Sequence, residues 1–245
     1  RPVYLTMKGV LLAELLDYTG TYPLAMGNLL LDKDVLEFDD VNKGDTPVQE
    51  IHILNNSLET MEPRLMHLPS YLDATYSSET LFPSKAATIT VTLHSDHLRD
   101  YGLTKTKVFL AQKLGEKVSA SNAVDMTITL LPDLKQFEGV SRAQAPKLQI
   151  SETDLDFTDF QKHQKKTIDV KLTNEGQTTL TISSMQMYTG GMKVTLDSRD
   201  IEPGQSTMLH VTGYKEELAQ VKGRPRILMI TNDADHAKIV INIKK

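Results

Sequence analysis

Hydrophobic and polar residues alternate with a period of two along most of the chain. Residues 87–94 (ATITVTLH) alternate threonine with Ile89, Val91 and Leu93, and the same alternation occurs at residues 167–173. This period is typical of β-strands that bury one face and expose the other, whereas a helix repeats about every 3.6 residues. The alternation therefore predicts an all-β chain.

One arrangement of these strands is present twice. Residues 29–61 align without a gap with residues 148–180, so that Phe38 corresponds to Phe157 at an offset of 119. The shared order continues through the later turns and strands of both copies. Two copies at this spacing predict two tandem domains and not a solenoid of short repeats.

Turn-forming residues divide each copy into short strands, for example at residues 42–44, 174–176 and 203–204. Roughly seven short strands per ~100 residues are typical of an immunoglobulin-like β-sandwich. The chain has no Cys and no Trp, which excludes the Cys–Trp–Cys core of antibody domains. We expect Phe38 and Phe157 to fill that core volume instead.

The repeat and the breaks in periodicity predict four segments. Residues 1–27 are expected to be the tail of a preceding repeat or an extra strand segment. Residues 28–132 form the first immunoglobulin-like β-sandwich, residues 133–146 a linker without periodicity, and residues 147–245 the second sandwich.

Helix is expected at only two places, which are equivalent in the two copies. Residues 95–101 and 214–221 each have the length of a short helical turn, and each is followed by a glycine. A glycine directly after a helical turn is a common stop signal.

Composition and charge exclude several classes of protein. The 245 residues are 40% hydrophobic and 24% charged, with a net charge of −5, which suits a folded chain and argues against a broad nucleic-acid surface. No apolar run approaches the ~18–20 residues of a membrane span. The lack of Cys excludes disulfides, thiolate metal sites and cysteine nucleophiles. Because the chain opens with Arg1 and not Met, we expect a processed or trimmed product, and any targeting signal would lie outside this sequence.

The sharpest local group of metal-binding residue types is His94, Asp96 and His97. Imidazole and carboxylate groups on one turn are ligands that zinc accepts. A third strong ligand is not evident nearby, and the equivalent positions in the second copy are Tyr214 and Glu217. Ordinary exposed loop histidines are therefore the favoured interpretation.

A second acidic group consists of Asp233, Asp235 and His236. Alternating carboxylates in a loop can bind calcium, but the glycine and distal glutamate of an EF-hand loop are missing. A hairpin turn at Asn232 and Asp233, between strands 226–231 and 237–243, is the favoured alternative.

Methionines and tyrosines offer two candidate contact surfaces. Met185, Met187 and Met192 around Tyr188 are either an adaptable binding surface or core filler along a strand, and we favour core filler. Tyr71 and Tyr76 are either contacts at a sandwich end or rim tyrosines packed on their own domain, and we favour packing.

No nucleophile elbow, phosphate loop or His-Glu-x-x-His motif occurs. We therefore predict no enzyme, with no catalytic, cofactor-binding or metal-binding residues and no cofactor.

The recurring motifs resemble bacterial Ig-like tandem repeats of uncharacterised function, which are related to the ASH and major-sperm-protein-like sandwiches. In the second copy the motifs are LDFTDF (155–160), LTNEGQTTLTI (172–182), IEPGQS (201–206) and ITND (230–233); in the first they are LEFDDV (36–41), ILNNSLETM (53–61) and LFPSKA (81–86).

Many members of this family carry a Cys-Gly-Cys after the N-E-G strand. The corresponding residues 183–194 hold no Cys, so the resemblance implies no redox or metal role here. Members are typically exported by Gram-negative bacteria, which implies a periplasmic location or one at the outer membrane or cell surface, often as a lipoprotein.

Repeated structural motifs without repeated chemical motifs predict a non-catalytic envelope protein. It is expected to act as a structural spacer or protein-binding module, with another protein or an envelope component as its partner and no nucleic acid. The alternative is a carbohydrate-binding accessory module, which the tyrosines favour and the lack of Trp disfavours. A hydrolase would require a cleft with two carboxyl groups about 5–10 Å apart.

Overall fold

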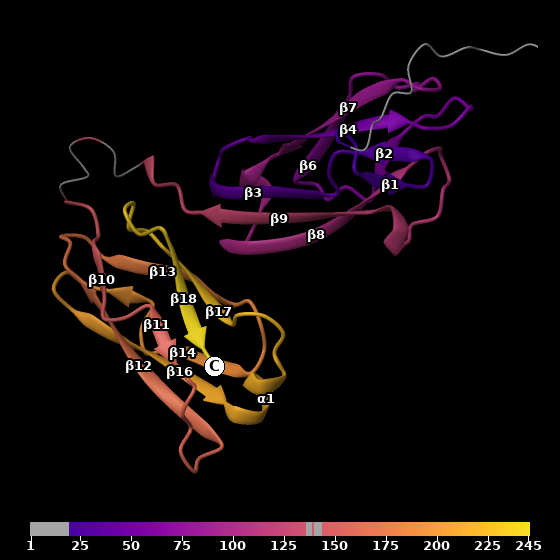
Figure 1. Cartoon of the computed structure of the whole chain (residues 1–245). Helices are drawn as coiled ribbons and strands as arrows, with labels where there is room; N and C mark the ends of the chain where they lie inside the picture. Colours follow the sequence, from indigo (N-terminus) through magenta and orange to yellow (C-terminus); the bar gives the residue numbers. More distant parts are fainter. Residues whose placement is uncertain (1–19, 136–138, 140–143) are drawn as a thin grey trace, which may run out of the picture.

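The computed structural model describes residues 20–135, 139 and 144–245, and almost all of its regular structure is β (Figure 1). The first sandwich contains β1 (Leu24–Met26), β2 (Leu29–Leu31), β3 (Val35–Asn42), β4 (Val48–Asn55), β5 (Arg64–Met66), β6 (Leu72–Tyr76), β7 (Ala86–Leu93), β8 (Gly102–Ala111) and β9 (Ala123–Leu131). The second sandwich contains β10 (Leu148–Ile150), β11 (Asp154–Asp156), β12 (Lys165–Asn174), β13 (Leu180–Met187), β14 (Met192–Leu196), β15 (Asp200–Ile201), β16 (Ser206–Tyr214), β17 (Arg226–Thr231) and β18 (Lys238–Lys244). The predicted all-β, immunoglobulin-like sandwich fold is confirmed.

Each sandwich consists of two sheets that enclose a hydrophobic core of their own. The first pairs a sheet of order β1-β2-β4-β7-β6 with one of order β3-β9-β8-β5. The second pairs a sheet of order β10-β12-β16-β14 with one of order β11-β18-β17-β13-β15. One apolar cluster fills the first sandwich and a separate one fills the second, as alternating strands require when each sheet buries one face.

The duplication extends to the topology of the strands. In the first sandwich β3 pairs in parallel with β9, and in the second β11 pairs in parallel with β18. Phe38 in β3 is 3% exposed, and Phe157 directly after β11 is 1% exposed. Both phenylalanines therefore supply core volume next to the parallel pair, as the sequence predicted.

Two buried asparagines close equivalent turns. The Asn55 amide nitrogen donates to the carbonyl oxygens of Glu59 and Leu81, and the Asn174 amide nitrogen donates to those of Thr178 and Ile201. Both asparagines are completely buried. A buried amide that satisfies backbone carbonyls explains why this residue type occurs at the same place in both copies.

Short helices lie at the two expected positions, and another, the 3₁₀ turn η2 (Ala120–Asn122), lies where none was expected. Residues Ser95–His97 form the 3₁₀ turn η1, and Lys215–Gln220 form α1. The predicted glycine stop is wrong, because the helices end at the C-caps Leu98 and Val221. Gly102 (φ +96°) and Gly223 (φ +85°) lie farther along, in the left-handed region that favours glycine. Among the residues that the structure describes, no helix has the length and hydrophobicity needed to cross a bilayer.

The N-terminal part of the chain differs from both copies. Residues 24–26 form β1, which pairs with β2 at the edge of a sheet of the first sandwich. Most of the segment predicted to be a repeat tail or extra strand, residues 1–19, lies outside the described residues. The predicted domain boundaries stay predictions.

Candidate functional site

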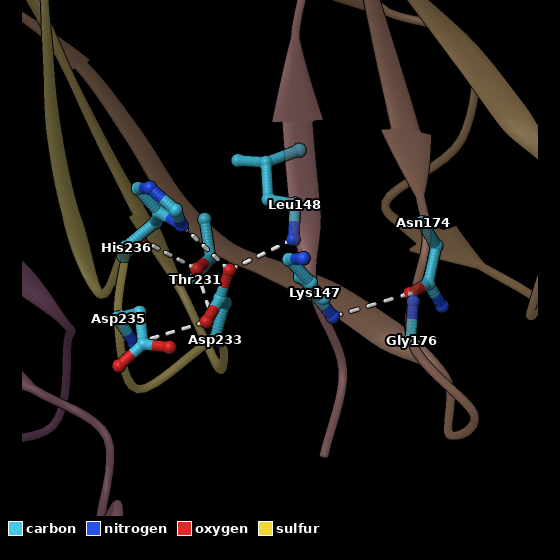
Figure 2. Close-up of polar contacts among 8 residues, drawn as sticks. All are labelled: Lys147, Leu148, Asn174, Gly176, Thr231, Asp233, Asp235 and His236. Carbon is cyan, nitrogen blue, oxygen red and sulfur yellow. Dashed lines mark hydrogen bonds and ion pairs between the residues drawn. The ribbon is translucent and has the colours of Figure 1, made fainter. Parts of the chain in front are cut away.

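The turn between β17 and β18 buries one carboxylate in the second sandwich (Figure 2). Asp233 is 2% exposed, and its Oδ2 accepts a hydrogen bond from the Leu148 amide at 2.7 Å. The same oxygen lies 2.9 Å from His236 Nδ1, and Oδ1 accepts from the Asp235 amide at 2.9 Å. The predicted hairpin is confirmed, since β17 pairs with β18. Its buried acid binds backbone groups and an imidazole of its own sandwich.

The chain enters the second sandwich between this turn and the Asn174 turn. Asn174 Oδ1 accepts hydrogen bonds from the Gly176 amide at 2.9 Å and the Lys147 amide at 3.3 Å (Figure 2). A Cβ atom on Gly176 would lie 2.4 Å from the carbonyl oxygen of Ala145, so only glycine permits this close crossing. The cavity beside the crossing measures about 170 Å³, which is smaller than the ~300–1,000 Å³ typical of small-molecule pockets. This polar cluster therefore fixes the chain entry and leaves little space for a ligand.

In the first sandwich, His94 is held by Asp73, a residue that the sequence analysis did not include in the His94, Asp96 and His97 group. His94 Nε2 lies 2.8 Å from Asp73 Oδ2 on β6, and His97 Nδ1 lies 3.1 Å from the Ser70 carbonyl oxygen. The rings of His94 and His97 are 5.7 Å apart, centroid to centroid. Within the described ranges, no three His, Cys, Asp or Glu side chains are arranged to hold a metal ion.

A third histidine lies between two carboxylates on the outer face of the second sandwich. His210 on β16 is 2.7 Å from Asp169 Oδ1 and 3.2 Å from Asp197 Oδ1. The hydrogen bond to Asp169 is the main reason that the pKa of His210 is raised above its ordinary value of 6.5.

We expect His210 to titrate above pH 6.5. Because the pKa is raised in the folded state, protonated His210 stabilises the fold fully below the unfolded-state pKa, and this contribution is lost as the pH rises through the folded-state pKa. Titration of the ring followed by NMR measures this pKa. Asp169→Asn should lower it more than Asp197→Asn does, and a pKa at or below 6.5 in the unmodified protein would contradict the prediction.

The two rim tyrosines pack on their own sandwich. Tyr71 and Tyr76 are half-buried against the core of the first sandwich. The Tyr76 hydroxyl accepts a hydrogen bond from the Leu65 amide at 2.8 Å, and the Arg64 guanidinium lies 4.7 Å from the Tyr76 ring centroid. The favoured packing interpretation is confirmed.

The methionines divide between core and surface. Met192 is buried, Met185 packs against the core at its edge, and Met187 is 45% exposed. Core filling therefore accounts for the first two only. Met185 and Met187 line a groove on one side of the second sandwich.

A cavity of about 670 Å³ lies beside β11 and the end of β18, and one of its two acids, Asp156, is ion-paired. Asp156 accepts hydrogen bonds from Thr158 and pairs with Lys244 at 3.2 Å. These contacts, those with Thr158 first, lower the pKa of Asp156 to about 2. A hydrolytic carboxyl pair needs one group that is protonated near neutral pH, so Asp156 does not supply the general acid.

The two sandwiches contact each other directly, which the sequence reasoning missed. The contact is an apolar cluster of Leu131, Leu228, Ile230 and Ala237, with Tyr101, Leu103, Leu134, Tyr188 and Val240 packed against it. Gln186 of β13 accepts from the Leu103 amide at 2.6 Å and donates to the Leu103 carbonyl oxygen at 3.1 Å. Lys238 lies 2.7 Å from Asp40 of the first sandwich.

One sequence signal could have revealed this contact. Residues 227–230 (ILMI) form a continuous apolar run where the other strands alternate, and such a run indicates a strand that is buried on both faces. Leu228 and Ile230 are completely buried on the face of β17 that points away from the core of the second sandwich.

The fold and these contacts define the class of protein: tandem immunoglobulin-like β-sandwiches. Residues 148–245, less than half of the chain, match the family described as "Protein of unknown function (DUF1573)". No curated protein matches the chain.

Solved structures show similarity in fold. The chain is similar to a protein of unknown function from Porphyromonas gingivalis W83, with 18% identity, a TM-score of 0.63, and coverage of 89% of this chain and 98% of that one. Weaker matches include the YadV chaperone (10% identity, TM-score 0.30, coverage 88% and 97%) and the E. coli chaperone DraB (12% identity, TM-score 0.32, coverage 89% and 96%). The first match shows a shared fold alone, and the scores of the chaperones are too low to establish even that.

Proposed function

We propose that this chain is a non-catalytic protein of the bacterial cell envelope, periplasmic or at the outer membrane or cell surface, which acts as a spacer and protein-binding module. The observation that supports the spacer role is the direct contact between the sandwiches, where Gln186 binds Leu103 and an apolar cluster is buried. A spacer must hold its modules in one arrangement, and an apolar contact reinforced by hydrogen bonds restricts relative motion. The partner is another protein or an envelope component.

We also propose that both sandwiches are relatives of the ASH and major-sperm-protein-like domains, on the strength of their repeated motifs.

Carbohydrate binding has less support than protein binding. Its motivation was the pair Tyr71 and Tyr76, and both rings pack against the core of their own sandwich. Sugar-binding tyrosines need an exposed ring face.

Leu228→Glu is expected to release the two sandwiches from each other. Leu228 is fully buried in the contact cluster, and a carboxylate there would lose its hydration without gaining a partner. Small-angle X-ray scattering should show a larger radius of gyration and a broader distribution of distances than in the unmodified chain. Leu58→Glu, at a position that is 95% exposed, should leave the scattering unchanged.

Capture of envelope proteins from extract tests the binding role. The unmodified chain as bait should retain a partner after crosslinking, and Leu228→Glu should retain less of it if the arrangement of the sandwiches matters. Scattering that is identical for Leu228→Glu and the unmodified chain, or a complete lack of captured protein, would count against the proposed function.

A further inference from the structure

A groove lined by four apolar side chains and one arginine runs along the open side of the second sandwich, between β13 and β14. Its lining side chains are Met185, Met187, Val194, Leu196 and Arg199, and its volume is about 200 Å³. β14 is the edge strand of one sheet. In the other sheet, β15 pairs only with residues 180–181 of β13. In the described part of the chain, residues 184–187 of β13 therefore have no strand on their outer side.

The first sandwich closes the equivalent place with its own side chains. There Leu65 of β5 stands opposite Leu110, and its amide donates to the Tyr76 hydroxyl at 2.8 Å. Arg64 stacks on the Tyr76 ring and forms an ion pair with Glu79 at 3.2 Å. Side chains that cap an edge strand in this way prevent another strand from pairing with it.

The second sandwich lacks this closure. Leu196 stands opposite Leu209 in β16, just as Tyr76 stands opposite Ile89 in β7, so Leu196 occupies the position of the closing tyrosine. Met185 stands opposite Met229 in the register that Leu65 has in the first sandwich. Its amide therefore points outward, and leucine has no oxygen to accept a hydrogen bond from it.

We propose that this groove binds an extended segment of a partner polypeptide, which adds as a strand to the outer edge of β13. Aliphatic side chains at alternate positions of the segment enter the groove, and an acidic side chain lies beside Arg199. This inference rests on the proposed binding function and names the chemistry of the partner.

The spacing of the residues that line the groove indicates why the partner segment should carry aliphatic side chains at alternate positions. Met185 and Met187 on β13, and Val194 and Leu196 on β14, are each spaced by two residues, which is the period of an extended strand. The volume of about 200 Å³ is below the ~300–1,000 Å³ of small-molecule pockets. It accommodates side chains of a strand whose backbone stays outside and pairs with β13.

The charge of Arg199 indicates an acidic residue in the partner segment, and the position of β13 indicates where the segment binds. The Arg199 guanidinium donates to the carbonyl oxygens of Ile182 and Ser183, and no ion pair of the described residues includes it. An acidic residue of the partner would supply the missing negative charge. Gln186, on the other face of β13, binds Leu103, so the strand that borders the groove also contacts the first sandwich. A strand added to β13 therefore extends a sheet that the first sandwich already supports.

Leu196→Tyr tests the proposal, because it introduces the closing residue of the first sandwich. Thr195→Tyr is the matched control, since Thr195 is exposed on the opposite face of the same strand. The probes are fluorescently labelled peptides of about ten residues with Val or Leu at every second position, Thr and Lys between them, and either Asp or Lys at one end. Fluorescence anisotropy with the full chain measures their affinity.

We expect the unmodified chain to bind the Asp-ended peptide more tightly than the Lys-ended one, and Arg199→Gln to abolish this preference. Leu196→Tyr should weaken binding by at least about tenfold, and Thr195→Tyr should change it by less than about twofold. Failure of every peptide to bind, or equal affinity of Leu196→Tyr and the unmodified chain, would overturn the proposal. A dimer in sedimentation that Leu196→Tyr dissociates would also overturn it, because the occupant would then be a second copy.

Capture from envelope extract separates this inference from the proposed function. A partner that the unmodified chain and Thr195→Tyr retain, and that Leu196→Tyr loses, supports both. A partner that Leu196→Tyr still retains leaves the binding function intact and shows that the groove is not its site.

Discussion

Replacing Phe157 with alanine is expected to lower the free energy of unfolding of the second sandwich by about 3–5 kcal/mol. The ring is 1% exposed and lies 6.1 Å, centroid to centroid, from the Phe160 ring. It also fits against the bare backbone of Gly213, where a Cβ atom would lie 2.6 Å from the ring carbon Cδ1. Truncation removes this apolar contact and leaves a cavity that the rigid sheets can close only in part.

Hydrogen exchange followed by mass spectrometry measures this loss for each sandwich separately. Protection should fall in the strands of the second sandwich and stay unchanged in β4 and β7 of the first. Phe82→Ala is the control, because Phe82 is 60% exposed and its loss should cost less than about 0.5 kcal/mol. A loss below about 1 kcal/mol for Phe157→Ala would show that the ring does not fill the core in solution.

Asn174→Ala is expected to destabilise the second sandwich by about 3–5 kcal/mol, a comparable loss. The side chain is completely buried, and its nitrogen donates to the carbonyl oxygens of Thr178 and Ile201. Its oxygen accepts from the amides of Lys147 and Gly176. Alanine removes all four bonds. The bond to Ile201 is buried, and a buried group left without a partner costs about 1–3 kcal/mol, whereas each of the three partly buried bonds contributes about 0.5–1.5 kcal/mol.

Chemical denaturation together with hydrogen exchange tests the role of the asparagine. Asn55→Ala should have the same effect on the first sandwich, because Asn55 makes the corresponding bonds to Glu59 and Leu81. Asn242→Ala provides the control, since Asn242 is exposed and its side-chain amide donates to Asp154 at the surface. If Asn174→Ala were as stable as the control, the turn would not depend on the amide.

The sequence predicted the features that depend on local pattern. The alternation in residues 87–94 predicted a strand, which the structure contains as β7. The alignment of Phe38 with Phe157 predicted equivalent core positions, and both rings are buried. The turn at Asp233 also followed from its residue types, because Asn and Asp favour the backbone of a tight turn. What the turn does was not predictable: Asp233 binds the amide of Leu148, which lies 85 positions away.

The candidate surfaces were predicted less completely. Met185 and Met187 were recognised as a pair that could be core or surface, and the structure places them on the rim of a groove. The closing role of Tyr76 in the first sandwich was missed, since its partner Leu65 lies on another strand of the opposite sheet. Comparison of the two copies would have shown that tyrosine is replaced by leucine at position 196, but not what the tyrosine does.

The sequence by itself determined that this protein is all-β, that one sandwich pattern occurs twice, and that a nucleophile elbow, a phosphate loop and a His-Glu-x-x-His motif are absent. These properties are encoded in neighbouring residues, because the period of burial and the chemistry of turns act over a few positions of the chain. Only the tertiary structure decided that Gln186 meets Leu103, that the outer face of β17 is buried between the sandwiches, and that one sandwich is closed where the other is open. These depend on which side chains meet across sheets, and residues distant in sequence become neighbours only when the whole chain folds.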